Sequence, residues 1–223
     1  MTAQQAPSPA QARDDVVVTD PSTTTTHWDG AYARGEQTLS WYAPNAAVSL
    51  RLITAANVAT SAAVIDIGGG TSRLVDALIE LGFEDLSVLD VSDAALVETQ
   101  RRLAGHATKV QWLVQDIRNW RPHRTYGLWH DRAVFHFQAN HADRHAYLAA
   151  LNAGTAPGSV AVFGTFAPDG PAQCSGLPVQ RYSPEQLAVT LGDQWQLESA
   201  KDEQHVTPAG TVQPFSWAVL RRR

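Results

Sequence analysis

The stretch Val64-Ile65-Asp66-Ile67-Gly68-Gly69-Gly70 decides the fold that we expect for this chain. A short apolar, β-branched run ends here at three glycines, and apolar residues at helical spacing follow from Leu74 to Leu81. A second apolar run, residues 86–89, ends at Asp90. This order predicts a strand, a glycine turn, a helix and a second strand, with an acidic side chain at the tip of each strand.

The spacing of the glycines and acids distinguishes two classes of ligand. Ligands of open α/β sheets bind at the carboxyl ends of the strands. The dinucleotide pattern G-x-G-x-x-G would need a third glycine where this chain has Arg73, and Asp66 would repel a pyrophosphate. Asp66 instead suits a ligand with a positive end, and Asp90 is placed to accept hydrogen bonds from the ribose hydroxyls of an adenosine. A glycine turn without any ligand is the alternative.

Composition limits the class of protein. A chain of 223 residues with 44% apolar residues predicts one α/β domain with a sizeable core. A net charge of −5 argues against nucleic-acid binding. One cysteine fits a reducing compartment, no apolar run is long enough for a bilayer, and no secretory signal is visible, so we expect a cytoplasmic protein. Residues 1–26 are polar and predict a disordered tail, which leaves residues 27–223 for the domain.

Aromatic residues are concentrated just after this tail. Trp28, Tyr32, Trp41 and Tyr42 lie within 15 residues, interleaved with polar groups. They fit an aromatic lid over a cofactor, because a sulfonium cation is attracted to aromatic faces. Packing of a first helix on the sheet is the alternative.

Two later strand ends carry polar side chains. The predicted strand 110–114 leads to Asp116 and Ile117, which could accept from an adenine amine and stack on its ring. An exposed loop aspartate is the alternative. The predicted strand 126–129 leads into a segment with His130, Asp131 and His136. His136 is a candidate general base. Asp131 could either orient His136 or bind an acceptor amine. A packed, hydrogen-bonded strand end is the alternative for these residues.

The remaining segments complete the pattern. His141 and His145 have metal-ligand spacing, but the H-E-x-x-H pattern fails, so no metal site is predicted. Residues 169–178 form a long polar loop that could wall an acceptor site. Alternating residues at 195–203 and 213–222 predict a terminal hairpin.

The motifs together resemble the class I, seven-stranded S-adenosylmethionine (SAM) methyltransferases. Asp66-x-Gly68-x-Gly70 is similar to their first motif and Asp90 to their second. The resemblance implies a doubly wound, Rossmann-like mixed sheet with helices on both faces, a C-terminal hairpin and an antiparallel last strand. It implies cofactor binding by Asp66, Gly68, Gly69, Gly70, Asp90, Val91, Asp116, Ile117 and Trp41. Around the acceptor we expect His130, Asp131, His136 and again Trp41.

Two groups of these enzymes differ in acceptor. The stretch 131–136 is similar to the D-K-G-T-F/W-D stretch of lysine methyltransferases that modify elongation factor 1A and citrate synthase, and Trp28, Tyr32 and Trp41-Tyr42 are similar to their W-D-x-x-Y…W-F lead-in. Ala133, Val134 and His136 depart from that pattern. The lead-in with Gly35-Glu36 is also similar to thiopurine, thiol/halide and tellurite methyltransferases.

We therefore expect in-line transfer of the SAM methyl to a nitrogen, oxygen or sulfur atom of a small molecule, which gives S-adenosylhomocysteine (SAH) as the product. A protein lysine acceptor is one alternative. A non-catalytic nucleotide-binding module is another. The sequence does not indicate the oligomeric state.

Overall fold

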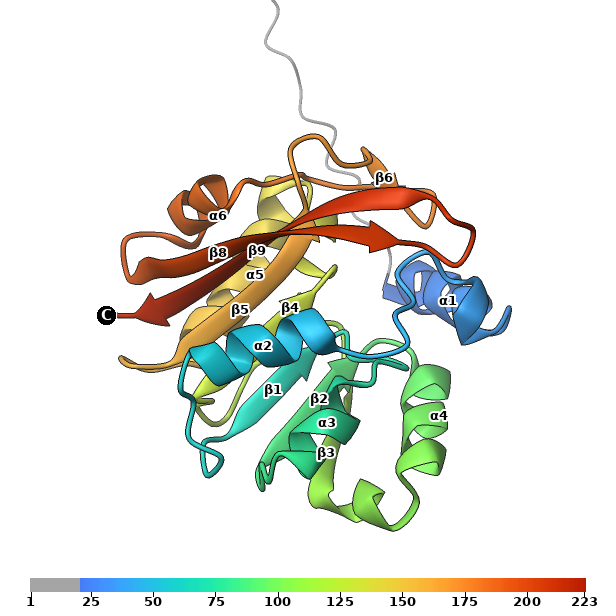
Figure 1. Ribbon diagram of the computed structural model, residues 1–223, viewed down its shortest axis with the longest axis horizontal. Helices are drawn as coiled ribbons and strands as arrows, with labels where there is room; N and C mark the ends of the chain where they lie inside the picture. Colours follow the sequence, from blue (N-terminus) through green and yellow to red (C-terminus); the bar gives the residue numbers. More distant parts are fainter. Residues whose placement is uncertain (1–20) are drawn as a thin grey trace, which may run out of the picture.

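A seven-stranded mixed sheet forms the centre of this computed structural model, which describes residues 21–223 (Figure 1). The strand order is β3-β2-β1-β4-β5-β9-β8. Strands β1 to β5 are parallel, whereas β9 is antiparallel to both β5 and β8. The bounds are β1 (Val64–Ile67), β2 (Leu86–Asp90), β3 (Val110–Val114), β4 (Leu128–Arg132), β5 (Val160–Phe166), β8 (Trp195–Val206) and β9 (Val212–Arg222). The predicted α/β sheet, terminal hairpin and antiparallel last strand are confirmed.

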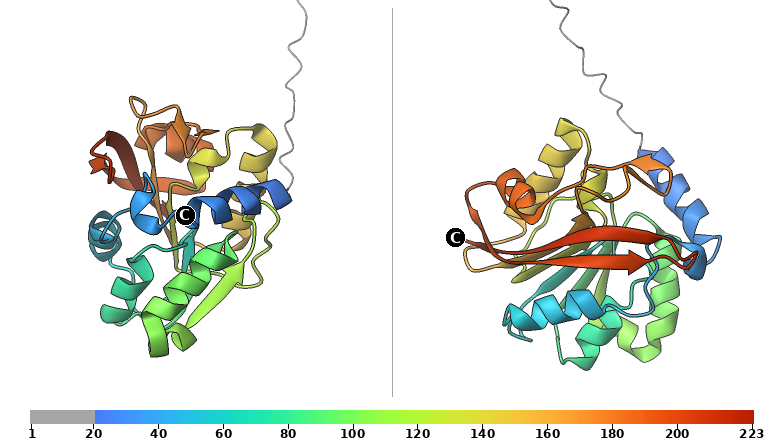
Figure 2. Two further views of the ribbon diagram at one scale, coloured as in Figure 1. Left: turned by 90° about the vertical axis from the view of Figure 1, so that its right-hand side faces the viewer. Right: turned by 45° about the horizontal axis from the view of Figure 1, so that its top comes forward.

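Helices cover both faces of the sheet because its buried strands alternate side chains between two apolar clusters. Val64 of β1 lies in the cluster with α2, α3 and α4, and its neighbour Ile65 lies in the cluster with α5 and α6. Figures 1 and 2 show these two layers. The helices are α1 (Pro21–Tyr32), α2 (Ala47–Ala55), α3 (Leu74–Glu80), α4 (Asp93–Leu103), α5 (His141–Ala153) and α6 (Pro184–Leu191), with 3₁₀ turns η1 (Glu36–Thr38), η2 (Ala104–Lys109) and η3 (Phe135–Phe137).

The strand order reverses between β1 and β4, because the chain builds β1, β2 and β3 outward and then crosses to the other side of β1. Such a switch point opens a crevice at the carboxyl ends of the two strands, where α/β proteins bind ligands. Helix α1 lies beyond these strand ends, next to α4 (Figure 1). The short hairpin of β6 (Gln173–Cys174) and β7 (Leu177–Pro178) forms a separate two-stranded sheet in the predicted loop 169–178.

Ser92 and Ser183 cap α4 and α6, since each side chain accepts a hydrogen bond from a backbone amide of the first turn. Two local expectations differ from the structure. The fourth parallel strand begins at Leu128 rather than Tyr126 and continues through Arg132, so His130 and Asp131 lie inside a strand. Residues 21–26 of the expected tail form the start of α1, and residues 1–20 lie outside the described range.

Candidate functional site

Two adjacent cavities lie at the carboxyl edge of the sheet. The larger, about 1200 Å³, extends from Asp90 and Asp116 to Cys174 of the β6–β7 hairpin, and α1 forms part of its wall. The smaller, about 310 Å³, borders Asp66 and His130. The two cavities share Tyr32, Trp41, Gly68 and Arg132 as lining residues. The larger cavity is of the size that holds a nucleotide cofactor together with a small molecule.

The predicted cofactor residues divide between the two cavities. Asp90, Val91, Asp116 and Ile117 line the larger cavity, and Asp66 and Gly69 line the smaller one. Gly68 and Trp41 line both, and Gly70 lines neither. The structure therefore brings eight of the nine predicted cofactor residues to one edge cavity or the other.

The glycine turn allows close approach of protein groups. Gly68 and Gly70 have φ angles of +66° and +42°, which favour glycine. A Cβ on Gly68 would overlap Val134, and a Cβ on Gly70 would overlap the hydroxyl of Tyr32. The glycine turn thus packs against the turn that follows β4 and against α1, and it leaves the Gly68 backbone at both cavity walls.

Asp90 is a buried carboxylate at the wall of the larger cavity. Its Oδ1 accepts a hydrogen bond from the backbone amide of Ser92 at 2.8 Å. Burial raises the pKa of the Asp90 carboxyl to about 7, and the charge of Asp66 acts in the same direction. Further hydroxyl donors would stabilise this ionised carboxylate, which is the chemistry that a ribose diol supplies.

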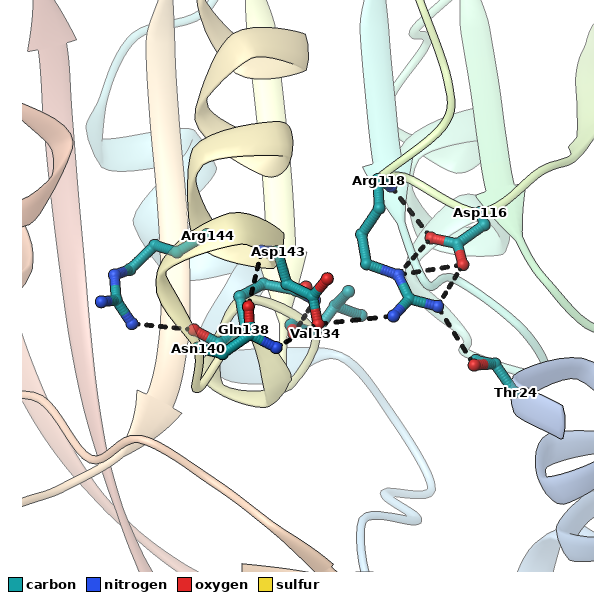
Figure 3. A network of polar contacts seen from close by, with 8 residues as sticks. All are labelled: Thr24, Asp116, Arg118, Val134, Gln138, Asn140, Asp143 and Arg144. Carbon is teal, nitrogen blue, oxygen red and sulfur yellow. Dashed lines mark hydrogen bonds and ion pairs between the residues drawn. The ribbon is translucent and has the colours of Figure 1, made fainter. Parts of the chain in front are cut away.

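Asp116 is held by Arg118 in a network that closes the same end of the cavity (Figure 3). Both carboxylate oxygens of Asp116 accept from the Arg118 guanidinium, at 2.5 to 3.0 Å. Arg118 also donates to Thr24 of α1 at 3.1 Å and contacts Asp143 of α5 at 3.4 Å. These bonds use both Asp116 oxygens, so an adenine amine would share an acceptor that the protein already occupies; the flanking Ile117 is buried at the cavity wall.

His130 lies in a buried chain of hydrogen bonds beside the smaller cavity. Its Nδ1 is 2.7 Å from Oδ1 of Asp66, and its Nε2 is 2.9 Å from Oγ of Ser49 on α2. All three residues are at most 4% exposed. His130 therefore fixes the position of Asp66 next to the glycine turn, and it lies away from the larger cavity.

Asp131 is surrounded by protein groups that hydrogen-bond its carboxylate. The side chain is fully buried, and its oxygens accept from the backbone amides of Val134 and Phe135 and from the hydroxyl of Tyr147 at 2.6 Å. These bonds fix the turn after β4, where Ala133 has a φ of +67°. Burial raises the pKa of Asp131 to about 6. Asp131 lines neither cavity and contacts no histidine side chain through a hydrogen bond.

His136 is also fully buried outside the two cavities. Its ring packs against Phe137 and Phe166, and its Nδ1 accepts from the Phe166 amide at 3.4 Å. Burial, followed by the charge of Arg132, lowers the pKa of His136 to about 3. The base function of His136 stays a prediction, and this position gives the ring no contact with a molecule in either cavity.

The aromatic residues before β1 form one wall of the larger cavity. Trp28 packs edge-on against Trp41 and Phe137, with ring centroids 5.5 and 5.1 Å apart. Tyr32 packs edge-on against Trp41 at 6.3 Å. Trp28, Tyr32, Trp41 and Phe137 line the larger cavity, whereas Tyr42, the fourth aromatic residue of the predicted lid, lines only the smaller one.

Sequence reasoning missed four residues of this site: Thr24, Ser49, Arg118 and Arg132. Thr24 lies in the expected tail, and Ser49 reaches His130 from a different element. Arg118 and Arg132 each follow a predicted site residue by one or two positions, so their proximity was the available signal.

Comparison with known proteins identifies a domain family and a fold. Residues 64–158 match the family model described as Methyltransferase domain. The chain is 32% identical over 103 residues to EEF1A lysine methyltransferase 2 of Danio rerio. The aligned segment covers 42% of this chain and 44% of that protein. The matched segment therefore spans less than half of that curated relative.

Two solved structures resemble nearly the whole chain. The Burkholderia thailandensis 1,6-didemethyltoxoflavin-N1-methyltransferase, with bound 1,6-didemethyltoxoflavin and SAH, has a TM-score of 0.71 at 17% identity and covers 93% of this chain and 92% of its own. The DhpI-SAM-HEP complex has a TM-score of 0.65 at 16% identity, with 90% and 96% coverage. At these identities the likeness concerns the fold, which is that of class I SAM-dependent methyltransferases.

Residues 21–223 lack two further kinds of feature. No helix in this part of the chain is long and apolar enough to cross a bilayer. Within the same range, no three histidine, cysteine, aspartate or glutamate residues are grouped as metal ligands would be.

Proposed function

We propose that this chain, which carries a methyltransferase domain in residues 64–158, transfers the methyl group of SAM to a small-molecule acceptor. The bound cofactor would supply a sulfonium methyl that is already electrophilic, so that no covalent enzyme intermediate is needed. The protein's contribution is then positioning and the exclusion of water.

The residues around the larger cavity fit the cofactor. Asp90 offers a buried carboxylate to ribose hydroxyls, and Val91 and Ile117 offer apolar contact to an adenine. Gly68 brings backbone to the cavity wall beside Asp66, whose charge suits the positive end of the molecule. Trp28 and Trp41 present aromatic surface to the same space, which favours a sulfonium.

A contact that bridges the acceptor end of the cavity is the observation that supports a small-molecule acceptor. His27 of α1 and Ser175 of the β6–β7 turn are joined by a 3.2 Å contact between Nε2 and Oγ. This bond bridges the two elements that wall the cavity opposite the sheet. A cavity bridged in this way suits a small molecule, and the structure of similar fold from Burkholderia thailandensis holds one, 1,6-didemethyltoxoflavin.

A protein lysine acceptor is the second candidate. The similarity to EEF1A lysine methyltransferase 2 favours this acceptor, although the similarity covers less than half of either chain.

We also propose that residues 27–223 form the domain and that α1 joins it from Pro21 onward. We propose that the protein acts in the cytoplasm, where its single cysteine stays reduced.

Cofactor binding can be tested by calorimetry with SAH. We expect Asp90→Ala to weaken SAH binding by at least about tenfold, which is about 1.4 kcal/mol of binding free energy, because the ribose hydroxyls lose their acceptor. Asp93→Ala is the matched control, since Asp93 is exposed on α4 outside both cavities. Equal SAH affinity in the Asp90 variant and the wild type would remove Asp90 from the cofactor site.

A further inference from the structure

Arg132 is the last residue of β4 and lies where the two cavities meet. The half-buried side chain donates from Nη1 to the backbone oxygen of Trp41 at 2.8 Å. Its Nη2 is 3.4 Å from Nδ1 of His205, and the guanidinium carbon lies 5.0 Å from the centroid of the Phe215 ring. These contacts hold the guanidinium in place between β9 and the aromatic lid.

Arg132 has no ion pair with a carboxylate among residues 21–223. Glu203 acts on it electrostatically from beyond ion-pair distance, while one Glu203 oxygen accepts from Nε1 of Trp217 at 2.7 Å. The guanidinium stays protonated at any working pH. A desolvated cation of this kind is costly unless an anion is bound beside it.

The acids that line the larger cavity do not offset this charge. Asp116 and Asp143 are both ion-paired with Arg118 at the cofactor end. Asp90 lies at that end too. Arg144, a second guanidinium at the wall, donates to the backbone oxygens of Gln138 and Ala139. The end of the cavity opposite Asp90 is therefore cationic and aromatic.

We propose that the acceptor is an apolar or aromatic small molecule that carries a carboxylate, and that Arg132 binds this carboxylate. The inference rests on the proposed function and narrows its substrate class. A planar guanidinium matches a carboxylate through two parallel hydrogen bonds, and the apolar remainder of the molecule would pack on Trp28, Trp41 and Phe137. A lysine ammonium would instead be repelled by the guanidinium of Arg132.

The first test uses an extract of the cells that make this protein, freed of macromolecules and passed over an anion exchanger at pH 7. The bound molecules are released at about pH 2, where carboxylates become neutral and phosphates do not. Each fraction is then incubated with the full chain and methyl-labelled SAM. We expect label transfer with the fraction released at about pH 2.

Transfer only with unbound molecules that carry no carboxylate, or with molecules that stay on the resin at about pH 2, would overturn the carboxylate assignment and leave the methyltransferase function intact. No transfer with any fraction or with the protein-containing extract would overturn the proposed function and this inference together. Label on a protein alone would overturn the small-molecule acceptor.

The second test asks whether Arg132 binds the carboxylate of the acceptor or the carboxylate of the cofactor. We expect Arg132→Met to lower label transfer at least tenfold and Arg132→Lys to recover part of it, while both variants keep SAH affinity within about twofold. Arg124→Met, which breaks an ion pair with Asp85 outside both cavities, is the control. A tenfold loss of SAH affinity in Arg132→Met, with unchanged affinity for decarboxylated SAH, would assign Arg132 to the cofactor and overturn the proposal.

Discussion

Asp90 is the buried group whose ionisation should change most when the cofactor binds. Its pKa is raised to about 7, first by burial and also by the charge of Asp66. Ribose hydroxyls donate to the ionised carboxylate, so binding favours that form. We expect SAH affinity to rise between pH 6 and pH 8, by up to about tenfold per pH unit below the pKa.

Calorimetry at pH 6, 7 and 8 measures this dependence, and Asp90→Asn should flatten it because the amide does not titrate. A wild-type affinity that is constant over this range would contradict the prediction. The same shift affects stability in the opposite direction. Because the folded pKa lies above the unfolded value of 3.8, the contribution of Asp90 to stability is present below about pH 4 and is lost as the pH rises through about 7.

Asp131 should matter for stability. Asp131→Ala leaves the amides of Val134 and Phe135 and the hydroxyl of Tyr147 without their acceptor, so the free energy of unfolding should fall by about 2–4 kcal/mol. Urea denaturation measures the loss. Asp131→Asn is the control, since its amide oxygen still accepts from the backbone and it should lose less. A stable alanine variant with no turnover would instead place Asp131 in the acceptor chemistry.

The sequence predicted the side chains on loops and strand tips better than those around β4. Asp90, Asp116 and Trp41 were expected at the site and line the larger cavity. The segment after Trp129 was expected to follow the strand at the carboxyl edge of the sheet, but it continues as a strand, in which successive side chains point to opposite faces. His130 and Arg132 therefore face the cavities and Asp131 faces α5, a division that composition does not reveal.

Helix α1 is an element that local sequence did not predict. Its threonine run offers little apolar surface, so residues up to 26 were expected to be a tail. In the structure it is held by polar contacts to distant elements: Thr24 to Arg118, His27 to Ser175 and Asp29 to Ser92. Contacts between residues so far apart along the chain form only when the whole domain folds.

Arg118 should control how firmly α1 closes the cavity. Arg118→Met removes the bond to Thr24 and the ion pairs to Asp116 and Asp143. We expect faster amide hydrogen exchange in α1 and SAH dissociation accelerated about tenfold, since fewer contacts hold the wall in place. Arg124→Met serves as the control for loss of a surface ion pair. Unchanged exchange in α1 would show that the aromatic packing alone holds the helix.

The class of sheet was predictable because strands and helices alternate along the chain. The antiparallel last strand was expected from the family resemblance, and the order of all seven strands is fixed by pairing across the folded chain. The cavities likewise depend on α1 and the β6–β7 hairpin meeting over the strand ends, which no single stretch of sequence specifies.

Transfer of labelled methyl from SAM into an extract of the source cells, followed by separation according to size, tests the central claim most directly. We predict label in the small-molecule fraction, and several-fold less of it when Asp90→Ala replaces the wild-type protein at a SAM concentration near the wild-type Kd. Tight SAM binding with no label in either the small-molecule or the protein fraction would contradict a methyltransferase function and favour a non-catalytic nucleotide-binding module.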